Sequence, residues 1–214
     1  MARVPRNQWP EVVFVGDQSR AVLSQAAKAG RALRLGPGIY ASRVSVPPEE
    51  TVRRNWAQIL NHELPGAIIT DRSARRSGPV DGILTVVHTR KRPLELPGLS
   101  IMPRPGAPTL FGDTSMLSVR LASRARAMLE NLRGRSRDRY LSPAEVETWL
   151  ADILVNEGSS NLLHVRDEAH RLAPLGGWAK ELRTLDAMIV AALSTRPAEI
   201  LSAEALRAHA AGVP

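Results

Sequence analysis

Apolar and polar positions near the start of the chain predict a strand followed by a helix. Residues 11–16 (EVVFVG) are apolar and largely β-branched, which is typical of a short strand. Asp17 and Ser19 are suitable N-caps for a helix that runs to about Gly30. The apolar positions of this helix fall near one face and are Val22, Leu23, Ala26 and Ala29.

The opposite face of this predicted helix is polar and basic. Arg20, Ser24 and Lys28 follow one another at i, i+4 and i+8 spacing, so they share a face. Residues 32–41 then alternate, reverse at the GPG sequence of 36–38 and return, which predicts a β-hairpin. Because L-proline suits ordinary turns better than mirror-image turns, we expect a slightly longer loop with a glycine at positive φ.

The middle of the chain predicts one helix and then a β-rich segment. Two prolines within 44–48 indicate a linker, and Pro48 with Glu49 and Glu50 begins a helix that runs to about Glu63. Four later segments have strand-like composition and are separated by Pro and Gly: AIIT (67–70), DGILTVVHT (81–89), LSIMPR (99–104) and MLSVRLA (116–122). Both faces of the second are apolar, which predicts a central strand covered on both sides.

From Ser123 onward the apolar positions follow a helical period. A first helix carries Ala125, Met128 and Leu132, and an arginine-rich loop follows at 133–139. Ser142-Pro143-Ala144-Glu145 is a capping-box start with proline at the first helical position. Further helices are predicted at about 161–172 and 178–193, with a short tail helix after Ser202.

Composition and charge favour a globular protein with a polyanionic partner. The 214 residues carry a formal net charge of +8, which favours association with nucleic acid. The alternative is a solvated basic surface with no such partner. The chain has no cysteine, which excludes disulfides and a thiolate metal site. It has neither a signal-peptide pattern nor an apolar run of membrane-spanning length, so we expect a cytoplasmic protein without a membrane partner.

The sequence contains no specific catalytic motif that we recognise. Neither a GxSxG elbow nor a GxxxxGK[ST] phosphate loop occurs, and we predict that the protein is not an enzyme and uses no cofactor or metal. His164 and Glu168, with His170 nearby, lack the spacing of a zinc site and are read as ordinary polar residues of a surface helix. Asp71 and Ser73 follow a predicted strand and suggest either a catalytic loop or, as we prefer, a capped turn.

Nucleic-acid contact is better supported because basic and polar residues concentrate in the first helix and hairpin. A helix of this kind enters the major groove while the hairpin, or wing, lies against phosphates. The candidate DNA-binding residues are Arg20, Ser24, Gln25, Lys28, Arg31 and Arg34. Ser24 or Gln25 would reach a base edge, and Lys28, Arg31 and Arg34 would hold phosphates. The alternative is a helix and hairpin that only pack on the body with their charges in solvent.

Two other basic clusters would extend this surface or remain solvated loops. The first comprises Arg72, Arg75 and Arg76, and the second Arg133, Arg135, Arg137 and Arg139.

The helix followed by GRALRLGPGIYAS (30–42) resembles the helix-and-wing segment of AbiEi-type antitoxins. The stretch that begins LPGAIITDRSA (64–74) is similar to the opening of that family's body domain, and SRARAMLENL (123–132) to its closing helix. The resemblance covers about residues 17–132. It implies a winged-helix-like head that binds its own operator and a protein that counters a toxin. The family's head usually has two or three helices before the wing, whereas this sequence predicts one.

The chain also resembles the N-terminal region that precedes Fic domains in some actinobacterial proteins. This likeness continues into EVETWLADIL (145–154) and NLLHVRDEAHRLAP (161–174). The HPFx[D/N]GNGR motif with which Fic enzymes transfer AMP or related groups does not occur here. The resemblance therefore implies a regulatory part without the catalytic part.

Together these observations predict an α+β protein with a small winged-helix-like head (1–45), a mixed α/β body (46–134) and a C-terminal helical cap (140–214). The predicted function is that of an antitoxin-like transcriptional regulator that binds operator DNA through its N-terminal helix and wing. The alternative is a regulatory module that does not bind DNA and acts on a separate Fic-type or nucleotidyltransferase-type toxin. The sequence leaves the oligomeric state open.

Overall fold

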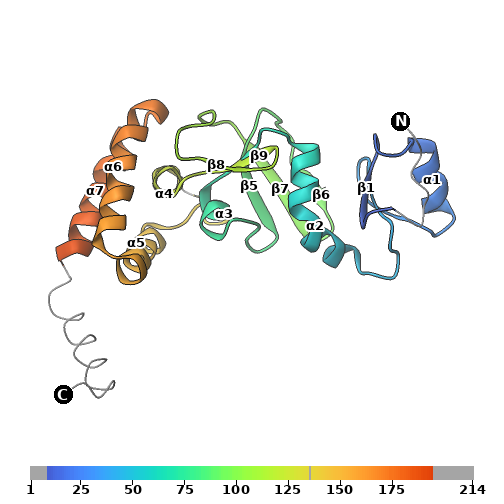
Figure 1. Cartoon of the computed structure of the whole chain (residues 1–214), viewed down its shortest axis with the longest axis horizontal. Coiled ribbons are helices and arrows are strands. Elements are labelled where there is room, and N and C mark those ends of the chain that lie inside the picture. Colours follow the sequence, from blue (N-terminus) through green and yellow to red (C-terminus); the bar gives the residue numbers. More distant parts are fainter. Residues whose placement is uncertain (1–8, 135, 195–214) are drawn as a thin grey trace, which may run out of the picture. The chain divides into compact units, whose positions relative to one another are not determined.

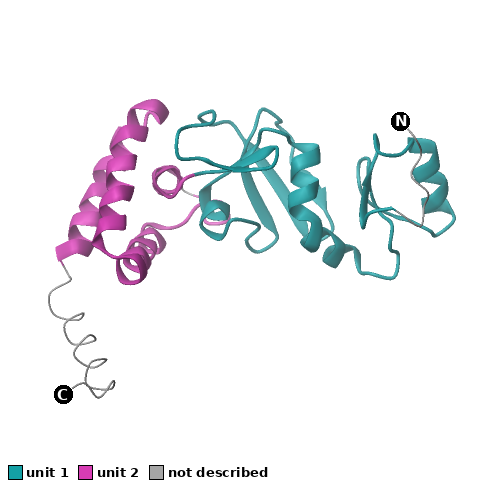
Figure 2. Cartoon of the chain, viewed as in Figure 1, with its two compact units in different colours: residues 1–122 teal, residues 123–214 magenta. Residues whose placement is uncertain are grey.

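The computed structural model describes residues 9–134 and 136–194, and the chain divides into two compact units (Figure 1, Figure 2). The first unit spans Met1–Ala122 and the second Ser123–Pro214. Within the described residues, helices combine with antiparallel and parallel strand pairs, which confirms the predicted α+β class.

This division differs from the three predicted segments. The predicted head and body lie in one unit, because they share a hydrophobic core. The helix that begins after Ser123, which the sequence placed at the end of the body, belongs to the second unit. Arg135 and the predicted tail helix after Ser202 lie outside the described residues. Below, the head means residues 9–45 and the body residues 46–122.

The described head consists of one helix on a three-stranded antiparallel sheet with strand order β1-β3-β2 (Figure 1). Ser19 begins the helix as predicted, and its hydroxyl accepts a hydrogen bond from the backbone N–H of Val22. The elements in chain order are β1 (Val12–Phe14), α1 (Arg20–Lys28), β2 (Leu33–Gly36) and β3 (Ile39–Ala41).

The hairpin between β2 and β3 turns more tightly than predicted. Gly36 pairs with Ile39, so only Pro37 and Gly38 form the loop. The expected glycine at positive φ is Gly38, with φ of 81°, which with proline before it fits an ordinary type II turn. The register shifts between Arg34 and Gly36, which marks a β-bulge in β2. The extra residue therefore lies in the strand and not in the loop, where we expect it from the sequence.

The body contains one long helix, one short helix and a six-stranded mixed sheet with strand order β6-β7-β5-β4-β9-β8 among the described residues. Pro48 begins the long helix as predicted. The elements are α2 (Pro48–Glu63), β4 (Ile68–Ile69), α3 (Asp71–Arg76), β5 (Ile83–Val87), β6 (Leu94–Leu96), β7 (Leu99–Arg104), β8 (Thr114–Met116) and β9 (Val119–Leu121).

Strand β5 lies in the interior of this sheet, as its apolar sequence predicted. It pairs in parallel with β7 on one side and antiparallel with β4 on the other. Leu84 and Val86 enter the main hydrophobic core, while Thr85 is buried and its backbone N–H donates to the hydroxyl of Ser73 on α3. Elements therefore cover β5 on both faces.

Three body elements differ from the sequence expectations. The turn expected around Asp71 is the helix α3, and strand β6 was not predicted at all. The single strand expected at 116–122 is a hairpin in which Leu117 and Ser118 form the turn between β8 and β9. Its backbone is held by Asn61 of α2, whose side-chain oxygen accepts from the N–H of Ser118 at 2.7 Å, so a distant contact decides this local structure.

The head and the body share one hydrophobic core. Val12, Phe14 and Ile39 of the head sheet belong to the same buried cluster as Ile59 and Leu60 of α2. The ring of Phe14 also stacks on His62 of α2 at a centroid distance of 3.8 Å. One face of the head sheet is therefore buried against the body.

The described part of the second unit consists of four helices (Figure 2). Ser142 and Glu145 form the predicted capping box at the start of the second of them. No helix among the described residues is long and apolar enough to cross a membrane. The helices are α4 (Arg124–Arg133), α5 (Pro143–Glu157), α6 (Ser159–Gly176) and α7 (Ala179–Ser194).

Candidate nucleic-acid interface

The pleat of the head sheet separates an inner from an outer face. Val12 and Phe14 point toward the body core, whereas Val13 between them packs in a smaller cluster with Leu23 of α1 and Tyr40 of β3. Alternate residues of a strand point to opposite faces, so α1 covers the face that the body does not. Figure 1 shows α1 on one side of β1.

The polar face of α1 is accessible, as its spacing predicted. Leu23 and Ala26 are buried against the sheet, which turns the opposite side of the helix to solvent. Arg20, Gln25 and Lys28 are exposed, and Ser24 is half-buried. The four residues predicted on this helix therefore lie on one accessible surface.

The two remaining predicted residues extend this surface beyond the helix. Gly30, with φ of 62°, ends α1, and the exposed Arg31 follows directly. Arg34 lies on β2 opposite Tyr40, so it stands on the same face of the sheet as α1. Its Nε donates to the carbonyl of Gly36 at 3.3 Å, which directs the guanidinium along the wing.

The acidic residues of the described head do not neutralise this surface. Glu11 accepts a hydrogen bond from Asn55 of α2 and lies 3.8 Å from Arg54. Asp17 accepts from the backbone N–H of Phe14. Within residues 9–134 and 136–194, Arg20, Lys28 and Arg34 form no ion pair with a carboxylate, so their charges are available to a polyanion.

The other two basic clusters lie on different elements. Arg72, Arg75 and Arg76 belong to α3, where Arg72 lies 3.6 Å from Asp81. Arg133 ends α4, and Arg137 and Arg139 follow in the next loop. These clusters belong to separate units and are not assigned to the candidate interface.

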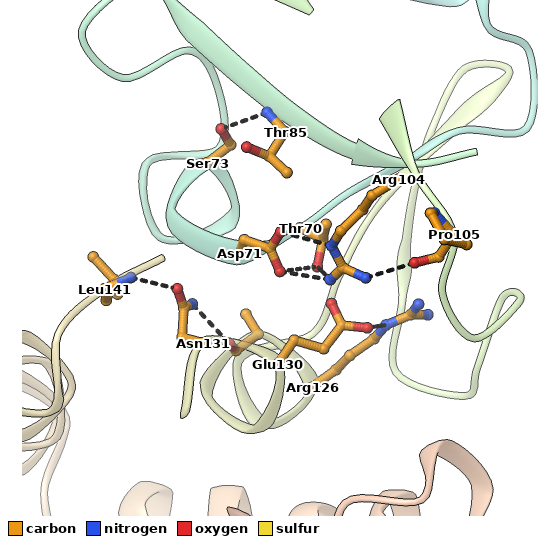
Figure 3. A network of polar contacts seen from close by, with 11 residues as sticks. Thr70, Asp71, Ser73, Thr85, Arg104, Pro105, Arg126, Glu130, Asn131 and Leu141 are labelled. Atoms are coloured by element: carbon orange, nitrogen blue, oxygen red, sulfur yellow. Dashed lines mark hydrogen bonds and ion pairs between the residues drawn. The ribbon is translucent and has the colours of Figure 1, made fainter. Parts of the chain in front are cut away.

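Asp71 and Ser73 hold the body together and do not form a free catalytic pair (Figure 3). The carboxylate of Asp71 is fully buried and accepts from Arg104, at 2.8 Å from Nε and 2.5 Å from Nη2. The hydroxyl of Ser73 accepts from the N–H of Thr85 at 3.0 Å. Sequence reasoning missed Arg104, because no local pattern relates it to a residue 33 positions away.

The histidines and acids of α6 also take part in local contacts. Arg166 and His170 both contact Asp186 of α7. The Nε of Arg166 lies 2.9 Å from Oδ1 of Asp186, and the Nε2 of His170 lies 2.9 Å from its Oδ2. Glu168 is buried, whereas His164 is exposed, so these two do not share an environment. Among the described residues, no group of three or more potential ligands is arranged to hold a metal ion.

Comparison of the chain with protein-family models, with curated proteins and with solved structures found no match. The resemblance to AbiEi-type antitoxins remains a prediction from the residues that carry it.

Proposed function

We propose that this protein is a DNA-binding regulator of the antitoxin-like kind, which contacts its own operator through α1 and the wing. The observation that carries the proposal is the two-sided head sheet. Its inner face is buried against the body, while its outer face presents α1 and Arg34 with three unneutralised cations. A cationic surface of this kind suits a polyanion.

The dimensions of the head fit this role. Helix α1 has nine residues, and an α-helix with its side chains is about 10–12 Å in diameter, which fits a major groove about 12 Å wide. In that position Gln25 and Ser24 would face base edges, and Lys28 and Arg31 the phosphates beside the helix. Arg34 on β2 would then meet the neighbouring phosphates, as a wing residue does.

The proposal is tested by fluorescence anisotropy of the full chain with a labelled DNA fragment from upstream of its own gene. We expect the affinity to fall steeply as salt rises, because bound cations release counterions from the DNA. Arg34→Ala should reduce the slope of log affinity against log salt by about one. The matched control is Arg183→Ala, which removes an equal charge from an exposed position of α7 and should leave the slope unchanged.

Base reading is separated from phosphate contact by Gln25→Ala. This variant keeps the charge, so it should weaken binding to the upstream fragment while leaving binding to an unrelated fragment unaltered. Absence of binding by the wild-type chain at low salt, or equal effects of Arg34→Ala and Arg183→Ala, would remove the proposed DNA contact.

A second candidate function is a regulatory module that binds a separate Fic-type or nucleotidyltransferase-type toxin without DNA. Large apolar side chains exposed on the helical unit favour it, among them Val155 at 68% and Leu175 at 58% exposure. Co-expression with the products of the neighbouring genes tests this function. A stable complex that Val155→Asp or Leu175→Asp disrupts would support it, and separation of every pair on purification would exclude it.

A further inference from the structure

A pocket of about 740 Å³ opens on the body at the carboxyl ends of β5 and β7. Val87 and His88 line it at the end of β5, and Pro103 and Pro105 at the end of β7. The two strands run in parallel, with Val87 opposite Arg104. The carboxyl ends of adjacent parallel strands commonly form ligand sites, because the chain leaves the sheet there and its loops diverge.

The lining of this pocket is basic. His88, Arg90 and Lys91 all belong to the segment that follows β5, and the lining contains no Asp or Glu. Lys91 is exposed and forms no ion pair with another described residue. Arg90 Nη1 lies 3.7 Å from a carboxylate oxygen of Glu63 outside the lining, and its guanidinium has further donors for a ligand.

His88 is oriented as a hydrogen-bond donor. The backbone N–H of Arg90 donates to its Nδ1 at 3.0 Å, so the neutral ring carries its proton on Nε2. The backbone N–H of His88 also donates to the carbonyl of Arg104 at 3.0 Å, which ties the basic segment to β7. The loop geometry thus leaves the Nε2 proton of this lining residue for another acceptor.

Other residues of the lining are apolar and closely packed. Pro65, Ile68 and Pro103 supply a surface of low polarity. Gly106 allows the next loop to lie close to the sheet, since a Cβ there would lie 2.7 Å from Val87 Cγ2 and 2.8 Å from Arg104 Nη1. A lining that combines basic donors with apolar side chains suits an organic molecule with an anionic end.

A second pocket on the body differs in charge. It measures about 580 Å³, and Glu49 and Glu50 line it together with a single cation, Arg53. Its carboxylates would repel an anion, so of these two pockets on the described body the one at the ends of β5 and β7 has the electrostatics of an anion site.

We propose that the pocket at the ends of β5 and β7 binds a small phosphorylated molecule. The phosphate lies against Lys91, Arg90 and the Nε2 proton of His88, because cations and polarised N–H groups form strong hydrogen bonds with phosphate oxygens. The organic part lies on the prolines of the lining. The inference is independent of the proposed DNA contact, since no residue of the head lines the pocket.

Titration calorimetry of the full chain with AMP, inorganic phosphate and adenosine tests this site. AMP should bind with one-to-one stoichiometry, inorganic phosphate more weakly, and adenosine not measurably. ¹⁵N NMR spectra recorded with AMP should change at the backbone amides of 87–91 and 104–109. Equal binding of adenosine and AMP, absence of binding by both phosphate-containing probes at millimolar concentration, or spectral changes confined to the head would each overturn the proposal.

Two neighbouring cations provide a matched pair of variants. Lys91→Ala should weaken AMP binding by about tenfold, the loss of one charge-assisted hydrogen bond. Arg92→Ala removes an equal charge from an exposed residue outside the lining and should have little effect. Equal losses in the two variants would show that AMP responds only to net charge, and would also overturn the proposal.

Discussion

At the scale of single residues, the carboxylate of Asp71 shows how a distant partner determines what a polar side chain does. It is fully buried and lies at a φ of 54°, a conformation that few side chains adopt readily. Two donors of Arg104 satisfy its oxygens, and this arginine is itself largely buried. The residue that looked like a candidate for catalysis is therefore engaged in joining α3 to β7.

Asp71→Asn is expected to destabilise the first unit by about 3 kcal/mol, because it removes the buried negative charge that accepts two hydrogen bonds from the largely buried guanidinium of Arg104. Asparagine tolerates the positive φ, so the substitution isolates the charge. Urea unfolding followed by circular dichroism measures the change. The control is Asp81→Asn, whose carboxylate is 78% exposed beside Arg72 and whose loss should cost less than about 1 kcal/mol. Equal losses of unfolding free energy in the two variants would contradict a stabilising role for the buried pair of Asp71 and Arg104.

At the scale of elements, serine side chains that accept from backbone N–H groups mark the starts of α1, α4 and α5. The hydroxyl of Ser142 accepts from the N–H of Glu145, and the Glu145 carboxylate accepts from the N–H of Ser142 at 2.8 Å. Ser19 and Ser123 cap α1 and α4 with their hydroxyls. These contacts are local, so short sequence patterns predict them. Helix α3 has no side-chain cap bond, and sequence reasoning did not find it.

Ser142→Ala is expected to destabilise the helical unit by about 1 kcal/mol, since it leaves N–H groups of the first turn of α5 without a side-chain acceptor. Thr148→Ala is the matched control on the same helix. Thr148 is exposed, its hydroxyl donates to the carbonyl of Ala144, and alanine has the higher helix propensity. Thermal unfolding should show a lower midpoint for the first variant only, and equal midpoints would refute the role of the cap.

At the scale of the whole molecule, the shared hydrophobic core makes the head a part of the same packed unit as the body. A head packed only by its own small cluster of Val13, Leu23 and Tyr40 would bury few side chains. Its other sheet face contributes Phe14 and Ile39 to the core of the body, so the fold of the head depends on α2. The head therefore does not act as an independently tethered module, and α1 packs on a sheet whose other face is buried against the body.

Phe14→Ala is expected to destabilise the head and the body together by about 3–4 kcal/mol, because it opens a cavity in the core that they share and removes the stack on His62. Hydrogen exchange followed by mass spectrometry should show faster exchange in both β3 and α2. Leu33→Ala, at a position that is 36% exposed, is the control and should alter neither strongly. Faster exchange limited to the head would contradict a common core.

The sequence by itself determined the features that depend on near neighbours. Helix α1 with its Ser19 cap, the hairpin around Gly38 and the start of α2 at Pro48 all follow from short-range periodicity and capping. The basic face of α1 was predicted for the same reason, since residues four apart on a helix lie side by side.

Only the tertiary structure decided the features that join distant residues. The pairing of Asp71 with Arg104, the turn of β8 and β9 held by Asn61, and the pocket lined by His88 and Pro103 each depend on which strands become neighbours. The spacing of apolar residues along the sequence predicts on which face of a helix or strand a residue lies, but not which element packs against that face. The packing of distant segments determines which element covers each face. It leaves the cations of α1 exposed and the carboxylate of Asp71 buried.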